Sequence, residues 1–163
     1  MAKRQPAIRY CLDTSFLING WHRRYRIDVF PTLWSAVDSL IEQGTICSCE
    51  EVLSELTRGD DALVTWAKER KACFQRPTSD TLANLRTVMQ SKPNIAATGG
   101  SLNRADPFVV AHAMTVHAIV VTDEQPAPNL RSTKPPKMPD VCDALGVKWL
   151  PPIEFLAAIK LVL

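Results

Sequence analysis

The feature that most constrains the fold is a short apolar run that ends abruptly in a carboxylate. Residues 8–12 are rich in amino acids that favour β-strands, and Asp13 follows them at once. The next two residues, Thr14 and Ser15, carry hydroxyl groups. A strand that stops at an acidic residue and passes into a helix is typical of the carboxyl edge of an open parallel sheet, where such folds place their functional sites. The sequence therefore predicts a parallel α/β fold with Asp13 at that edge.

A second apolar run has the pattern of a central strand. Residues 118–122 are continuous, apolar and β-branched, which is typical of a parallel strand buried on both faces, and Asp123 and Glu124 follow. Further strands are expected at 45–49 and 147–150. The helical spacing of apolar residues predicts helices at 29–43, 50–58, 60–71, 79–90, 140–145, from 106 onward and from 152 onward. This alternation predicts a three-layer α/β/α sandwich around a parallel sheet.

The composition fits one domain in a reducing compartment. With 163 residues and 46% hydrophobic content, the chain is expected to form a single domain over residues 1–163. The five cysteines are odd in number and lack a Cys-x-x-Cys pair, so we expect a cytoplasmic protein without a zinc knuckle or a complete disulfide framework. No stretch approaches the ~18 apolar residues of a membrane span, and no membrane association is expected. The formal charge of +2 is too small to identify a nucleic-acid binder.

Acidic residues follow or begin the elements that should meet at the carboxyl edge of the sheet. These acids are Asp13, Glu55, Asp106, Asp123 and Glu124. At an effective dielectric of ~20, two carboxylates about 4 Å apart repel by roughly 4 kcal/mol, so a counterion is expected. Oxygen ligands select hard cations such as Mg²⁺, Mn²⁺ or Ca²⁺, and these ions support displacement chemistry at phosphorus. For Asp106 the alternative is a structural role as a helix cap.

Four segments of the chain resemble the signature blocks of PIN domains, in the order and spacing of that family. They are residues 12–18, 52–56, 105–113 and 120–124. The resemblance spans nearly the whole chain, and residues 137–147, which include a Met-Pro-Asp-Val-Cys segment, also resemble a PIN-like branch of small bacterial and archaeal proteins of uncharacterised function. The resemblance to PIN domains implies an α/β/α sandwich and a Mg²⁺- or Mn²⁺-dependent ribonuclease. Such proteins are typically VapC-like toxins of type II toxin–antitoxin pairs, so RNA is the implied substrate, with an antitoxin protein and a homodimer as partners.

The resemblance also assigns roles to individual residues. Asp13, Glu55 and Asp106 match the family's first three metal-binding acids. The fourth is Glu124, with Asp123 as the alternative, and the number of metal ions, one or two, is left open. Hydroxyl groups beside these acids would orient the carboxylates or a metal-bound water, namely those of Thr14, Ser15 and Thr122.

A basic segment interleaved with aromatic residues follows the first acid. Residues 21–26 read WHRRYR, and their arginines, Arg23, Arg24 and Arg26, are candidates to bind RNA phosphates while an aromatic ring stacks on a base. The alternative is a solvated loop whose aromatic side chains pack on the core. Lys134, in a proline-rich loop after the last acids, is a further candidate RNA contact, with a solvated loop again as the alternative.

Two other classes of function fit parts of this pattern. One is a catalytically weak PIN-like module that binds RNA or protein, which the glutamate at position 124 and the modest net charge favour. The other is a phosphatase of the haloacid-dehalogenase type, which requires a second aspartate where this chain has Ser15. A metal-dependent endoribonuclease is therefore the expected function, with the binding module as its alternative.

Overall fold

The centre of the fold is a five-stranded sheet in which all strand pairs are parallel. The computed structural model describes residues 7–59, 61–92, 97–98, 101–102, 105–127 and 136–161. The strand order is β3-β2-β1-β6-β7. The strands are β1 (Arg9–Leu12), β2 (Ile46–Cys49), β3 (Phe74–Gln75), β6 (Ala118–Val121) and β7 (Trp149–Leu150), and β4 (Ala97–Thr98) and β5 (Ser101–Leu102) form a separate antiparallel pair.

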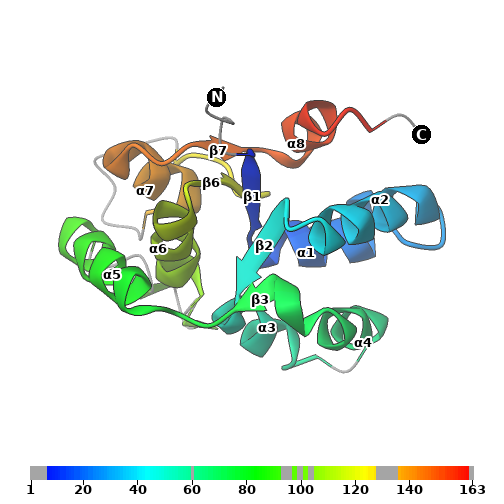
Figure 1. The fold of residues 1–163 in the computed structure, drawn as a ribbon, viewed down its shortest axis with the longest axis horizontal. Helices are drawn as coiled ribbons and strands as arrows, with labels where there is room; N and C mark the ends of the chain where they lie inside the picture. Colours follow the sequence, from blue (N-terminus) through cyan, green and yellow to red (C-terminus); the bar gives the residue numbers. More distant parts are fainter. Residues whose placement is uncertain are drawn as a thin grey trace, which may run out of the picture.

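Helices cover both faces of this sheet (Figure 1). The helices are α1 (Thr14–Asn19), α2 (Pro31–Glu42), α3 (Glu50–Leu56), α4 (Ala62–Glu69), α5 (Ser79–Ser91), α6 (Asp106–Val116), α7 (Met138–Leu145) and α8 (Pro152–Ala158), with a π-helix η1 (Gly20–Arg24) and a 3₁₀ turn η2 (Lys71–Cys73). Helices α5, α6 and α7 lie on one side, and α1, α2 and α8 lie on the other. The three-layer α/β sandwich predicted from the sequence is therefore confirmed.

Strand β1 shows how the two faces are packed. Side chains alternate along a strand, so Tyr10 and Cys11 point to opposite faces. The Tyr10 ring lies 5.1 Å from the ring of Phe155 in α8, and the Cys11 thiol lies 3.9 Å from the carbonyl oxygen of Val109 in α6. Because both faces are covered, Tyr10, Cys11 and Leu12 are all buried without alternation, as in most parallel strands.

The register between β1 and β6 determines which residues meet at the carboxyl edge of the sheet. Leu12 pairs with Val121, so Asp13 and Thr122 leave the sheet side by side. The Asp13 amide donates to the Val121 carbonyl at 3.0 Å, which extends the pairing to the first acidic residue. Within the described part of the chain, no helix is long and apolar enough to cross a membrane.

Candidate active site

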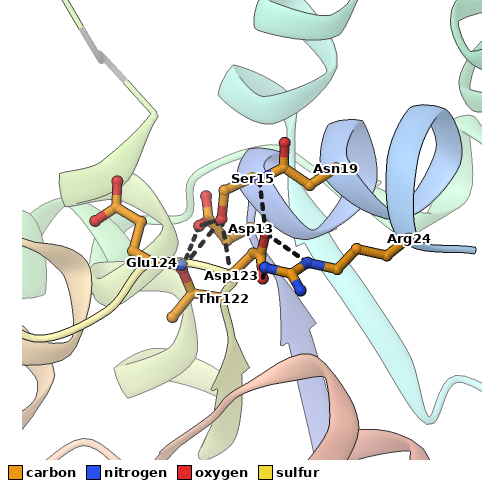
Figure 2. A network of polar contacts seen from close by, with 7 residues as sticks. All are labelled: Asp13, Ser15, Asn19, Arg24, Thr122, Asp123 and Glu124. Carbon is orange, nitrogen blue, oxygen red and sulfur yellow. Dashed lines mark hydrogen bonds and ion pairs between the residues drawn. The ribbon is translucent and has the colours of Figure 1, made fainter.

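Asp13 is held by two hydroxyl groups at the carboxyl edge of the sheet (Figure 2). It is 2% exposed, and its Oδ2 accepts hydrogen bonds from Ser15 Oγ at 2.6 Å and Thr122 Oγ1 at 2.7 Å. Each hydroxyl in turn accepts a backbone amide, from Asp123 at 3.0 Å and from Glu124 at 3.2 Å respectively. A hydroxyl has a single proton, so these amides leave both hydroxyl protons directed at Asp13. The carboxylate is thereby oriented through one of its two oxygens.

The environment of Asp13 raises its pKa even though these hydroxyls stabilise the charged form. Burial is the largest cause, and the negative charge of Glu124 adds to it. The hydrogen bonds from Ser15 and Thr122 act in the opposite direction, and the resulting pKa is about 6. The charged form therefore lacks sufficient compensation from the protein itself.

Asp106 experiences the same effects more strongly. It is the first residue of α6 and is 2% exposed. Burial is the largest cause that raises its pKa, to about 9, and the negative charges of Asp13, Glu124 and Glu55 add to that effect. The nearby ammonium group of Lys137 opposes it. The N-cap position of α6 is Ala105, so Asp106 stands in the first turn of the helix and not at the cap position itself. The structure thus brings together four of the five acids expected from the sequence.

Two glutamates complete this group, and both are held by hydrogen bonds. Glu55 Oε2 accepts the Thr14 hydroxyl at 2.6 Å, and its Oε1 accepts the Ala105 amide at 3.1 Å. These bonds connect α3 with the starts of α1 and α6. Glu124 Oε2 accepts the Met138 amide at 2.8 Å, at the start of α7. Each bond uses only one of the lone pairs of the carboxylate, so both glutamates can still bind a ligand through the remaining ones.

Asp123 lies in a different environment, although it adjoins Glu124 in the sequence. Its side chain is 5% exposed and is turned toward α1 and η1, as Figure 2 shows. Its Oδ2 accepts Asn19 Nδ2 at 2.7 Å and Arg24 Nε at 3.1 Å, and its Oδ1 lies 2.9 Å from Arg24 Nη2. A bidentate arginine therefore balances this carboxylate. Of the two alternatives for the fourth acid, Glu124 is the one whose charge acts on the two buried aspartates described above.

The aromatic residues of the basic segment pack on the core. Trp21 is 7% exposed, and its ring lies 4.8 Å from that of Trp34 and 5.8 Å from that of Trp66. Tyr25 is partly buried, with its ring 6.2 Å from that of Phe30. A base cannot stack on Trp21 because the ring is enclosed, so the packed alternative holds for this residue.

The basic side chains of the segment differ in their partners. Arg26 forms a salt bridge with Asp28, and both residues are exposed. Arg23 is exposed and has no hydrogen-bond or ion-pair partner among the described residues. The remaining candidate, Lys134, lies outside the described residues. Asn19 was not expected as a site residue, although it stands four positions after Ser15 and so shares its helix face.

The donor chemistry of the acidic group fits a hard divalent cation. All of its ligand atoms are carboxylate oxygens, and at least two of the carboxylates are buried with raised pKa values. In the part of the chain that the structure describes, however, no three His, Cys, Asp or Glu side chains form a ready-made metal-binding group. Mg²⁺ typically retains several waters in protein sites, so it does not need every ligand from the protein.

Taken together, the fold and the edge define an α/β protein with a PIN-like fold and an acidic site at the carboxyl ends of its central strands. The chain belongs to the family described as "Domain of unknown function (DUF4411)", whose model matches residues 10–163. Among solved structures it is similar to a chain of "VapBC2 from Rickettsia felis bound to a DNA fragment from their promoter". That match has a TM-score of 0.54 and 12% sequence identity, and it covers 88% of this chain and 98% of that chain. At this identity the likeness shows a shared fold. No curated protein matches the sequence.

Proposed function

We propose that this protein is a metal-dependent endoribonuclease that hydrolyses RNA phosphodiester bonds. The proposal rests mainly on Asp106, a buried aspartate surrounded by three further carboxylates whose charges raise its pKa. A protein gains no stability from such an arrangement, because desolvation and like-charge repulsion both disfavour the ionised state. A cation supplied from outside would offset both costs, and the PIN-like fold supports phosphodiester hydrolysis as the reaction that uses it.

Asp13 and Asp106 would hold Mg²⁺ or Mn²⁺, and Glu55 and Glu124 would complete the site or hold its waters. The bound cation would lower the pKa of water and stabilise the charge that develops on the phosphate. Hydrolysis adds water to phosphorus and breaks the bond to the 3′ oxygen, leaving a 5′-phosphate and a 3′-hydroxyl.

The hydroxyl residues have defined tasks in this scheme. Ser15 and Thr122 fix Asp13 through Oδ2, and Thr14 fixes Glu55 through Oε2. Such contacts set the direction of a carboxylate before its ligand arrives, which reduces the reorganisation needed on binding. Asp123 would act indirectly, because its oxygens are engaged by Asn19 and Arg24.

We further propose that the protein is the toxin of a type II toxin–antitoxin pair, acts in the cytoplasm and forms a homodimer. The similar fold in a structure titled VapBC2 supports the toxin proposal. An antitoxin would have to cover the acidic edge, since the proposed chemistry takes place there. Arg23 and Arg26, on the exposed segment beside this edge, and Lys134 are proposed to contact the RNA backbone.

A catalytically weak PIN-like module that binds RNA or protein is the second candidate. It is favoured by one specific observation: oxygens of Glu55 and Glu124 are already occupied by Thr14 and by the amides of Ala105 and Met138. If these bonds persist when a cation binds, Glu55 and Glu124 would reach it only through their remaining lone pairs, which restricts the coordination geometry. Such a site would bind metal weakly and turn over slowly.

The test is cleavage of an end-labelled RNA pool by the purified protein with Mg²⁺, Mn²⁺ or EDTA. Asp13→Asn removes the charge at the centre of the site, and Asp143→Asn, an exposed aspartate of α7, is the matched control. We expect metal-dependent cleavage by the wild type and by Asp143→Asn, and none by Asp13→Asn. Cleavage that persists in Asp13→Asn would refute the site assignment. Absence of cleavage from well-folded protein with either metal would favour the binding module.

A further inference from the structure

The segment after α1 has a backbone geometry that places one arginine beside the acidic site. Residues Gly20–Arg24 form a π-helix, closed by a 2.8 Å hydrogen bond from the Tyr25 amide to the Gly20 carbonyl. Short π-helical turns are rare and occur frequently at functional sites. This turn ends at Arg24, whose guanidinium reaches the Asp123 carboxylate across 99 positions of the chain (Figure 2).

The π-helix is firmly attached to the core. Trp21, within the turn, is enclosed by Trp34 and Trp66, whose rings are 5.4 Å apart. Trp34 also donates its indole N–H to the Tyr25 carbonyl at 2.6 Å, directly after the turn. The backbone on which Arg24 stands is therefore held on both sides, and little conformational entropy is left to lose when a ligand binds there.

The contacts of Arg24 leave part of its guanidinium available. Arginine has five N–H groups, and Asp123 takes Nε–H and one N–H of Nη2. Among the described residues Arg24 has no other hydrogen-bond or ion-pair partner, and its side chain is 55% exposed. Three N–H donors are thus free to meet an acceptor from solution. Since the Asp123 amide also bonds to Ser15, which bonds to Asp13, this cation is connected to the acidic site by a continuous set of contacts.

We propose that Arg24, held by Asp123, to which Asn19 also donates, is the group that binds a phosphate of single-stranded RNA next to the acidic site. The inference rests on the proposed function for the identity of the strand. A planar guanidinium fixed on one side by a carboxylate presents its remaining donors in the geometry that suits a phosphate. The arginine would retain the strand while the carboxylates and their cation act on a neighbouring phosphodiester.

The test is the binding of a fluorescently labelled single-stranded RNA, measured by anisotropy in EDTA at several salt concentrations. Arg24→Gln should weaken binding about five- to tenfold at low salt and reduce the slope of log affinity against log salt by about 0.7, the loss of one phosphate contact. Arg24→Lys should keep most of the slope, because it retains the charge. Lys148→Gln is the matched control: it removes one exposed positive charge just before β7, at the opposite edge of the sheet, and should change affinity less than about twofold.

A double variant separates phosphate binding from the release of Asp123. Arg24→Gln/Asp123→Asn has the same net charge as the wild type, and we expect it to bind RNA as weakly as Arg24→Gln. If the double variant binds RNA with wild-type affinity, the proposal is overturned. The loss of affinity in Arg24→Gln would then come from the Asp123 carboxylate that Arg24 no longer pairs with. An equal loss in Lys148→Gln would overturn it as well. The binding assay is run in EDTA, so it does not depend on metal-dependent cleavage. If binding depends on Arg24 but the cleavage assay with Mg²⁺ or Mn²⁺ shows no nuclease activity, the proposed function is refuted and this inference stands.

Discussion

Two buried aspartates at the same edge of the sheet have opposite electrostatic surroundings. Asp106 is surrounded by other carboxylates, and its pKa is raised to about 9. Asp123 is nearly as buried, yet it is bound by a bidentate arginine and an asparagine. A buried carboxylate paired with an arginine is a structural element, whereas mutual repulsion among several carboxylates is the property that we propose a cation from solution relieves. The comparison identifies the side of the edge at which we propose that a cation binds.

The largest difference between the two aspartates is expected in catalysis. Asp106→Asn should reduce RNA cleavage on the order of 10²–10³-fold, because it removes charge from the proposed metal site. Asp123→Asn should reduce cleavage less than about tenfold, because its role is to hold Arg24. Initial rates of cleavage at saturating Mg²⁺ measure both. Equal losses in the two variants would mean that Asp123 is also a metal ligand.

A cation should stabilise the wild type and not the variants that lack the site. At about 100 times its dissociation constant, a ligand adds about 2.7 kcal/mol to the free energy of unfolding. For a chain of this size that corresponds to a rise in Tm of very roughly 5–10 °C. Thermal unfolding with Mg²⁺ or Mn²⁺ against EDTA should show this rise in the wild type, a normal rise in Asp143→Asn, and little in Asp13→Asn. Equal rises in all three proteins would place the cation elsewhere.

Without metal, the two aspartates should respond to neutralisation with opposite signs. In EDTA at pH 7, Asp106→Asn should stabilise the fold, because the folded wild type must keep a proton on this carboxyl, whose pKa is about 9, and a neutral amide avoids that cost. Asp123→Asn should destabilise the fold by about 1–2 kcal/mol. The expected loss is small because the Arg24 side chain is more than half exposed and solvent screens its charge. Chemical denaturation measures both. Destabilisation of similar size in both variants would remove the distinction between the two sides of the edge.

The increase in stability expected from Asp106→Asn should depend on pH. The folded pKa of Asp106 is raised from 3.8 to about 9, so the folded state binds more protons than the unfolded state between these values. The stability of the metal-free wild type therefore has a contribution that is complete below about pH 4 and is lost as the pH rises toward 9. Asp13, with a pKa of about 6, adds a smaller contribution with the same sign, lost between about pH 4 and 6. The difference in Tm between Asp106→Asn and the wild type should grow from pH 4 to pH 8, and a constant difference would contradict the raised pKa.

The smallest change in stability is expected for the hydroxyl that orients Asp13. Thr122→Val keeps the shape of the side chain and removes the 2.7 Å hydrogen bond to Asp13 Oδ2. We expect a loss of about 1 kcal/mol in stability and of about tenfold or more in cleavage. Thr87→Val, at an exposed position of α5, is the control. Unchanged cleavage in Thr122→Val would show that Ser15 alone is sufficient to orient the carboxylate.

The parallel α/β fold and the acids at its carboxyl edge were predictable because their signals are local. An apolar run such as residues 118–121 indicates a buried strand by its own composition, and the ends of parallel strands must meet at one edge. Asp13, Glu55, Asp106 and Glu124 were therefore expected near one another before any contact was known. The very short strands, such as β3 with two residues, carry too little pattern to be predicted from periodicity.

The partners of the charged side chains were decided by the tertiary structure alone. Residues 21–26 are equally basic and aromatic whether they face RNA or the core, and only packing against Trp34 and Trp66 encloses Trp21. In the same way, Asp123 and Glu124 are chemically similar neighbours, and it is the π-helical turn that brings Arg24 to one of them. The sequence by itself determined the sheet and the collection of acids, because hydrophobic periodicity and strand direction are properties of short segments. Which acid received the bidentate arginine depended on the three-dimensional approach of a residue 99 positions away, which no short segment encodes.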